Sequence, residues 1–396
     1  MQPLKKLIGR ILNIKGAGDG SYTSLTDGGR GTPLSGNSSD AQLLASNRNW
    51  VFTCVDRIST TMSGIELELR TMDKKNNEVE VEDHKVLSLL RKPNNYMTGR
   101  DMVYMLISHI KLTGNAYILL DQPTNPTQLA VLIPSNVQLK FSADRTSIEG
   151  YTYRAGGKAV TYPADRVIHL KTPSITNPFK GSGILTNIAS WVDVDDAATE
   201  FNRLFFVNGA APSGVLETEA TSEEALLIAK RGFEMRYSGT NNAHKTAVLV
   251  KGAKYNPLST SPRDMQFSEM DTRYRDKILA AFGVPKSVAG ITDDVNRASA
   301  EANIYVYMMF TIDPLAKWFV AYLNEWLLPK FTGTEKMYFC YDELVPENED
   351  LEIRQNQAAL GGQSYKTINE VRGDEGLAPI ENGDYIYGGF ATVPIG

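Results

Sequence analysis

The spacing of hydrophobic positions predicts two kinds of structure in the first half of the chain. Between Ala41 and Thr113 the apolar residues recur mainly at helical spacing. This pattern predicts a helix closed by Gly64, a strand over residues 65–70 and two further helices. From Asn115 to Thr172, short runs rich in β-branched and aromatic residues alternate with turn residues, which predicts antiparallel strands rather than repeated βαβ units.

Longer helical patterns dominate the second half. Two of them, over residues 184–208 and 262–282, flank a compact insertion that is predicted to form a strand, a helix and a strand. A third helix is predicted from Ala298 to Leu328, with Pro314 inside it. Because a proline there removes a backbone hydrogen bond and collides with the preceding turn, we expect a kink at Pro314. A strand over residues 336–342 and two short helices follow.

Composition narrows the class of protein. The 396 residues suffice for more than one hydrophobic core, and 42% hydrophobic and 22% charged residues are ordinary for a folded chain. A formal net charge of −5 lacks the basic character that tight nucleic-acid binding requires. No apolar run approaches the ~18 residues of a membrane span.

The first forty residues differ from the rest. Residues 1–15 have helical apolar spacing with Lys5, Lys6 and Arg10 on other faces. This fits a short arm that docks on a partner, or a weak membrane-surface helix. Residues 16–40 are rich in glycine and serine, cannot bury a core, and are predicted to form a flexible linker.

Residues that carry chemistry are scarce. The chain has no phosphate-binding loop, and the stretch around Ser182 has Lys180 where a nucleophile elbow needs glycine. The four histidines are scattered, without the His-x-x-x-His spacing of a metal pair. The sequence therefore predicts no catalytic residue, no metal site and no cofactor. A hydrolase that uses Ser182, His169 and an aspartate is kept as an alternative.

Two groups of acidic residues are open to interpretation. Asp193, Asp196 and Glu200 recur at i, i+3 and i+7, so they share one helix face. That face is either ordinarily solvated or turned toward something that must not adhere, such as a moving polyanion. The polar stretch "AGITDDVNRASAEAN" carries Asp293 and Asp294 without the ligand spacing of a calcium loop, so the residues alone favour a solvated turn there.

Six segments resemble, in the expected order, the portal proteins of tailed double-stranded DNA phages, of the long-tailed siphovirus type. They are "LLRKPNNYMTGRDM", "LTGNAYILL", "RVIHLKTPSITNPFKGSGIL", "FFVNGAAPSGVLE", "AAFGVPKSVAG" and "TINEVRGDEGLAPIENGD". The resemblance extends from about Asn47 to Asp384 and leaves the first forty residues outside it.

The resemblance implies an α+β portal fold and a ring, usually of twelve copies, at one vertex of a capsid. DNA would be packaged and ejected through the channel of this ring. The implied parts are a wing over 41–183 and 298–345 that includes the kinked helix, stem helices over 184–210 and 262–283, a small α/β clip over 211–261, a tunnel loop over 284–297, and a short helical crown and tail over 346–396. The flexible arm and linker over residues 1–40 lie outside the resemblance.

The resemblance also implies which residues face DNA. The implied tunnel loop contains Gly290, Ile291, Thr292, Asp293, Asp294, Val295, Asn296 and Arg297, and the implied channel wall contains Asp193, Asp196 and Glu200. A mildly acidic wall would leave the duplex mobile, because each neutralised phosphate releases counterions and strengthens binding.

The implied partners are those of a capsid vertex. They are double-stranded DNA held without sequence specificity, the large terminase subunit, the major capsid protein or scaffold, and a head-completion or adaptor protein, with no membrane. The implied location is the virion and, during assembly, the host cytoplasm. Another oligomeric head–tail adaptor is the alternative within the same assembly.

Overall fold

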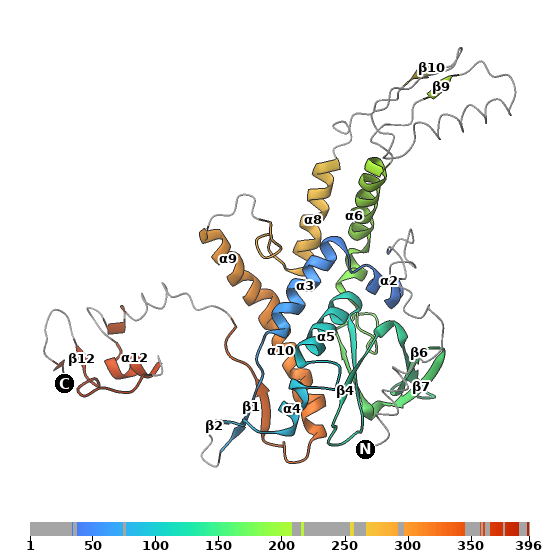
Figure 1. The fold of residues 1–396 in the computed structure, drawn as a ribbon. Helices are drawn as coiled ribbons and strands as arrows, with labels where there is room; N and C mark the ends of the chain where they lie inside the picture. Colours follow the sequence, from blue (N-terminus) through green and yellow to red (C-terminus); the bar gives the residue numbers. More distant parts are fainter. Residues whose placement is uncertain are drawn as a thin grey trace. The chain divides into compact units, whose positions relative to one another are not determined.

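The computed structural model describes two separate units of the chain (Figure 1). The first is Met1–Asp342 and the second is Glu343–Gly396. The described residues are 34, 38–73, 77–207, 215–217, 254–256, 267–291, 297–344, 357, 359–360, 365–374, 377–387 and 394–395. The arm over residues 1–15 and the helix predicted inside the insertion lie outside them.

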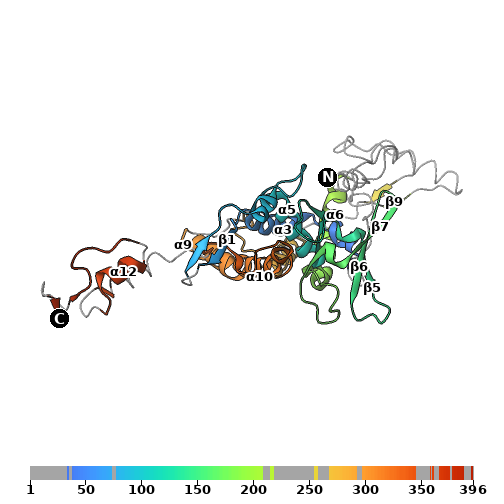
Figure 2. The same ribbon diagram turned by 90° about the horizontal axis from the view of Figure 1, so that it is seen from below.

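The described first unit contains eight α-helices. They are α2 (Asp40–Ala45), α3 (Asn49–Ser63), α4 (Lys85–Arg91), α5 (Gly99–Thr113), α6 (Ile184–Val207), α8 (Phe267–Phe282), α9 (Arg297–Tyr307) and α10 (Asp313–Tyr322). In both views α3 lies between α5 and the α9–α10 helix (Figure 1 and Figure 2).

The prediction of one helix ending at Gly64 is wrong between α2 and α3. Helix α2 ends at Ala45, and the hydroxyl and the backbone N–H of the following Ser46 both donate to the carbonyl of Gln42, at 2.9 and 3.1 Å. Arg48 is extended, with φ −148°, and Asn49 has φ 51°. Gly64 does end α3, as predicted.

All the described strands of the first unit pair antiparallel, as the alternating pattern predicts for residues 115–172. One sheet has the order β11 (Met337–Cys340), β1 (Glu68–Met72), β2 (Glu78–Glu80). A second has the order β4 (Leu129–Leu132), β3 (Asn115–Leu120), β8 (Val167–Lys171). A third has the order β5 (Val137–Phe141), β6 (Ile148–Ala155), β7 (Lys158–Pro163).

Strand β3 lies at the centre of the core, because every one of its residues is buried. Tyr117 and Leu119 pack with Tyr151, Tyr153 and Tyr162 of the third sheet. The α5 helix precedes β3 directly: it begins with a capping box between Thr98 and Asp101 and ends at Gly114. This buried core lies within the segment that the resemblance assigns to the wing, and the bounds of the wing stay a prediction.

The long helix predicted over residues 298–328 is interrupted. Between α9 and α10 the chain forms a π-helical segment, η5 (Met308–Ile312), and after α10 a second one, η6 (Leu323–Leu327). A 3₁₀ turn, η7 (Leu328–Lys330), ends it. Pro314 lacks the N–H that an α-helix would bond to the carbonyl of Phe310, which explains why the hydrogen-bond pattern changes just before it. The kink at Pro314 stays a prediction.

The second unit is small in its described part. It contains α12 (Ile368–Asp374) and the antiparallel pair β12 (Ile386–Tyr387) and β13 (Pro394–Ile395). The side chain of Asn369 holds a turn, because its Nδ2 donates to the carbonyl of Ile380 at 3.0 Å and to Asp384 Oδ1 at 2.8 Å.

In the insertion of the first unit, the described strands β9 (Val215–Glu217) and β10 (Lys254–Asn256) pair antiparallel.

Candidate functional site

Helices α6 and α8 lie side by side and correspond to the two predicted stem helices (Figure 1). Their ends nearest the body are buried through Leu185, Ile188 and Val192 on α6 and Ile278, Leu279 and Phe282 on α8. Lys277 joins the two helices, because its Nζ lies 5.4 Å from the ring centroid of Trp191 and 5.0 Å from that of Tyr274. The pair is therefore anchored at one end by an apolar contact and a cation–π cluster.

The root of α6 is held by one buried side chain, Asn115. Its Oδ1 accepts from the N–H of Gly181 at 2.7 Å, and its Nδ2 donates to the carbonyls of Thr113 and Gly181 at 2.9 and 3.1 Å. Asn115 is the first residue of β3, and Gly181 lies three residues before α6 begins. These bonds therefore fix the start of α6 to the corner between α5 and β3.

Three glycines let the two backbones approach at this root. A Cβ added to Gly181 would collide with the carbonyl of Gly114, and one added to Gly183 would collide with the carbonyl of Leu112. Gly114 has φ +76°, a conformation that other residues adopt only at a cost. The contact requires glycine at each position, which gives a physical reason for "LTGN" and "KGSG" in the sequence.

The histidine proposed for the hydrolase alternative belongs to this root. The ring of His169 stacks on Tyr117 with centroids 4.3 Å apart, and its Nε2 lies 3.1 Å from Asn115 Oδ1. Burial, with Lys171 and Lys180 nearby, lowers the pKa of His169 to about 3. Within the described part of the chain, the hydroxyl of Ser182 forms no hydrogen bond with His169. His169 is therefore bonded to Asn115 in the described structure, and the absence of catalysis stays a prediction.

The acidic residues of α6 have partners within the chain. Asp196 accepts from Arg48, with Nη2 at 2.7 Å and Nε at 3.1 Å, and from Asn49 Nδ2 at 2.9 Å. Hydrogen bonding to Asp196 raises the pKa of Arg48. Asp193 Oδ1 accepts from the backbone N–H of the buried Leu34 at 2.7 Å. Leu34, Arg48 and Asn49 are therefore hydrogen-bonded to α6.

Glu200, the third acidic position, pairs along its own helix. Its carboxylate lies 2.7 Å from Nε and 2.8 Å from Nη2 of Arg203, at i, i+3 spacing. This hydrogen bonding raises the pKa of Arg203. Asp193, Asp196 and Glu200 are thus not three bare charges, and the assignment of their face to the channel stays a prediction.

The predicted tunnel loop begins in a compact turn after α8. Gly283 has φ +69°, and Thr311 Oγ1 of η5 donates to its carbonyl at 2.6 Å. Lys286 Nζ lies 2.7 Å from Asp276 Oδ2, which ties the turn back to α8. Gly290 has φ +87° and open space around it.

The backbone N–H of Ile291 closes this turn by donating to the carbonyl of Lys286 at 2.9 Å. The rest of the predicted loop, Thr292, Asp293, Asp294, Val295 and Asn296, lies outside the described residues. The side chain of Arg297 also lies outside them, although its backbone begins α9.

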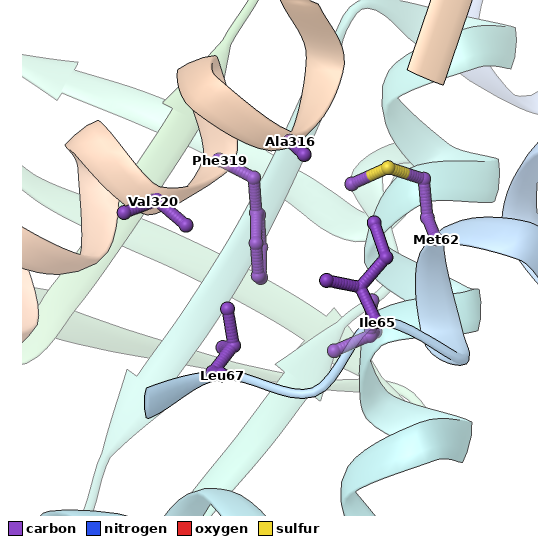
Figure 3. Close-up of a pocket in the computed structure, with 7 residues that line it drawn as sticks. Met62, Ile65, Leu67, Ala316, Phe319 and Val320 are labelled. Atoms are coloured by element: carbon purple, nitrogen blue, oxygen red, sulfur yellow. The ribbon is translucent and has the colours of Figure 1, made fainter. Parts of the chain in front are cut away.

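An apolar hollow lies between the end of α3 and α10 (Figure 3). It is lined by Met62, Ile65, Leu67, Val103, Ala316, Phe319 and Val320. All seven side chains are apolar, so none of them can orient a polar ligand. The hollow is therefore part of the core packing that supports the helices.

Across the described residues no three histidine, cysteine, aspartate or glutamate side chains gather as metal ligands. Nor does any helix among them combine the length and apolarity needed to span a bilayer.

Several of these residues are missed by sequence reasoning. Arg48 and Arg203 neutralise two acidic positions, yet the helical spacing identifies only the acids. Asn115 gives no sequence signal beyond its place after Gly114, and the glycines around Ser182 are first considered as a failed nucleophile elbow. The glycines in both segments, Gly114 in one and Gly181 and Gly183 in the other, are the sequence signal that could have indicated a close approach of the two backbones.

Comparison with known proteins agrees with this architecture. The family model described as "Phage portal protein" matches residues 49–376. The "Probable portal protein" of Streptomyces phage phiC31 is 29% identical over 72% of this chain and 64% of its own length. The "Portal protein" of Enterobacteria phage HK97 is 23% identical over 87% of this chain and 82% of its own length.

Solved structures agree as well. A chain in the neck of an empty gene transfer agent particle, computed with C6 symmetry, has a TM-score of 0.64. It is 26% identical and covers 90% of this chain and 98% of its own length. A chain in the neck of the native particle, computed with C12 symmetry, is 24% identical with a TM-score of 0.62 and covers 91% of this chain and 99% of its own length.

The mixed helical and sheet fold is shared with chains of necks computed with C6 and C12 symmetry, which indicates a structural subunit of a ring. The chain belongs to the phage portal protein family. Its role is therefore that of a structural portal protein at a capsid vertex, as the six resembling segments indicated.

Proposed function

We propose that twelve copies of the chain form a channel through which double-stranded DNA enters the capsid during packaging and leaves during ejection. The observation that carries the proposal is the family match over residues 49–376, which includes both stem helices and the loop between α8 and α9. The neck computed with C12 symmetry supports the number twelve. Assembly takes place in the host cytoplasm, and the finished ring stays in the virion.

The stem face of α6 and the loop over residues 284–297 line this channel. Double-stranded DNA carries one negative charge per roughly 1.7 Å of its axis, so any free arginine on the wall would hold it. On α6, Asp196 occupies the guanidinium of Arg48, and Glu200 occupies that of Arg203. The carboxylates thus keep the wall non-adhesive by neutralising arginines, rather than by repelling phosphate as bare charges.

Asp196 and Glu200 thus act on DNA through the arginines that they neutralise. Bare carboxylates repel phosphate only within about 8 Å at physiological salt. An arginine whose charge is already balanced by a carboxylate neutralises a phosphate only weakly, so few counterions leave the DNA and little binding free energy is gained. The duplex is therefore left free to slide whichever stem residue it passes.

The parts of the chain outside the channel dock other proteins of the capsid vertex. The insertion over residues 211–261 docks the large terminase subunit and later a head-completion or adaptor protein. The body contacts the major capsid protein or scaffold. The terminase supplies the energy of packaging, and this chain supplies no catalysis and needs no cofactor. The buried state of His169 and its bond to Asn115 support that absence of catalysis.

Negative-stain microscopy combined with a packaging assay tests this function. The purified chain is expected to form rings with a central hole. Shortening Thr292–Asn296 is expected to leave the rings intact while packaging or retention of DNA is impaired. Monomers at every concentration would contradict the ring, and full packaging by the shortened chain would contradict the role of the loop.

A further inference from the structure

Helix α9 and segment η5 expose five large apolar side chains, which we name the α9 face. Phe310 is 67% exposed, and Ile304 is 47% exposed. The remaining members, Tyr305, Val306 and Met309, are also exposed. From Ala302 to Ile312 the chain carries no charged residue, so the face has no ionic rim along its own helix.

The opposite side of the same segment is fixed to the body. Tyr307 is buried, and its hydroxyl lies 3.4 Å from Thr61 Oγ1 of α3. Thr311 donates to the carbonyl of Gly283, and Ile312 is fully buried. Figure 1 shows α9 at the rim of the first unit with α3 beside it. The α9 face is therefore presented on a rigid element and does not belong to a frayed helix.

The helix geometry aligns four of the five side chains of the face. Tyr305 and Met309, like Val306 and Phe310, are separated by four residues. They therefore lie one above the other along an α-helix. The wider π turn of η5 begins at Met308 and keeps Met309 and Phe310 exposed while Ile312 turns inward.

The size of the face indicates a protein partner. From the exposed fractions of its five side chains, the face offers roughly 500 Å² of apolar surface, against largest patches of about 300–600 Å² on monomers. A standard interface buries roughly 800 Å² on each partner, so this face would supply most of one side.

The chemistry of the face excludes two other occupants. DNA needs lysine or arginine to meet its phosphates, and an interfacial membrane helix carries such residues beside its apolar side. Neither residue occurs between Ala302 and Ile312. An uncharged, rigid apolar face on a ring-forming chain instead fits the surface of a protein that is always present, which is the next copy of the chain.

We propose that the α9 face is the seam at which each subunit packs against its neighbour in the ring. The inference rests on the ring of the proposed function. Because α9 follows directly after the loop over residues 284–297, the seam joins that loop of one copy to the next copy. Neighbouring loops are then coupled through the α9 helices instead of moving independently around the channel.

Photo-crosslinking tests the seam directly. Benzoylphenylalanine is incorporated at position 310 and, as a matched control, at position 175, where Ile175 is fully exposed in the loop before α6. Rings are assembled from an equal mixture of isotopically labelled and unlabelled chains. Position 310 is expected to give crosslinked peptides of mixed isotope and a ladder of whole multiples of the chain, at least tenfold more than position 175.

The failures of the seam and of the ring can be told apart. Intact rings in which position 310 crosslinks only within its own chain, to a foreign protein or to nothing overturn the seam and leave the ring standing. A parent chain that never forms rings overturns both.

A second variant gives an independent readout. Phe310→Asp is expected to reduce the ring fraction at least tenfold in light scattering, with an unchanged thermal midpoint of the monomer. Ile175→Asp is expected to leave the ring fraction unchanged. Full ring formation by Phe310→Asp would overturn the seam.

Discussion

The root of α6 and the α9 face solve opposite problems within the same unit. At the root, the side chain of Asn115 donates to the carbonyls of Thr113 and Gly181 and accepts from the N–H of Gly181, and the glycine backbones pack in contact. At the α9 face, five apolar side chains meet solvent. The root is complete within one chain, whereas the face is complete only when a second molecule covers it.

The difference shows how one chain serves a ring. Parts that must hold a fixed angle, such as the start of a stem helix, are closed by buried hydrogen bonds, because an unpaired buried group costs about 1–3 kcal/mol. Parts that join copies stay apolar and open, because their surface is buried only on assembly. Variants of the first kind are expected to affect folding, and variants of the second kind to affect assembly.

The largest effect is expected at the root. Gly181→Ala would drive a Cβ into the carbonyl of Gly114, a backbone atom that cannot move aside, so we expect a loss of about 3 kcal/mol or more in the free energy of unfolding. Gly64→Ala is the control, because its added Cβ would meet nothing closer than 3.4 Å, and it should change stability by less than about 0.5 kcal/mol. Chemical denaturation measures both; equal effects would contradict the close contact.

The second effect concerns pH. Burial lowers the pKa of His169 to about 3 and that of His109 to about 4, from 6.5. The unfolded chain therefore binds more protons than the folded one as the pH drops below about 6.5, and the free energy of unfolding falls between pH 7 and pH 5. Each histidine adds a slope of up to about 1.4 kcal/mol per pH unit.

His169→Gln sharpens that test, because glutamine can still donate to Asn115. It should remove the contribution of His169 and leave that of His109, so the slope of stability against pH decreases without vanishing. Urea titrations at pH 7, 6 and 5 measure it. A slope equal to that of the parent chain would mean that His169 is not buried as described.

A smaller effect is expected where the stem meets DNA. Asp196→Asn removes the charge that balances Arg48, so double-stranded DNA should bind the ring a few-fold more tightly. The dependence of log K on log salt should steepen by roughly 0.9 for each freed Arg48 that meets a phosphate.

The matched control for that prediction is Glu149→Gln. It frees Lys140, 3.5 Å away on the third sheet, which is not a stem helix. Fluorescence anisotropy over a series of salt concentrations compares the two variants. Equal gains in DNA affinity would show that α6 does not line the channel.

The smallest effect is expected between the stem helices. Lys277→Met removes the cation over Trp191 and Tyr274 while keeping the apolar stem, so the free energy of unfolding should fall by about 0.5–1 kcal/mol. A double-mutant cycle with Trp191→Leu measures the coupling. A coupling of zero would mean that apolar packing alone holds the pair together.

Local patterns predicted local structure well. The end of α3 at Gly64 and the antiparallel strands after Asn115 each depend on a few neighbouring residues, and both are found. The break at Ser46–Arg48 was not predicted, because it depends on Asp196, 148 residues away from Arg48. The hydrogen bonds at the root of α6 are not predictable from local patterns for the same reason, since Asn115 and Gly181 lie 66 residues apart. The sequence predicts only an apolar-rich helix at the α9 face, because the spacing of apolar residues does not show which of them are buried within the same chain.

A cryo-electron microscopy map of the purified ring tests the central claim most directly. The account predicts a closed ring in which α6 of every copy faces the central channel, Asp196 and Glu200 remain paired with Arg48 and Arg203, and the α9 face packs against the neighbouring copy. A closed ring in which α6 faces outward, or in which Phe310 stays in solvent, would contradict it.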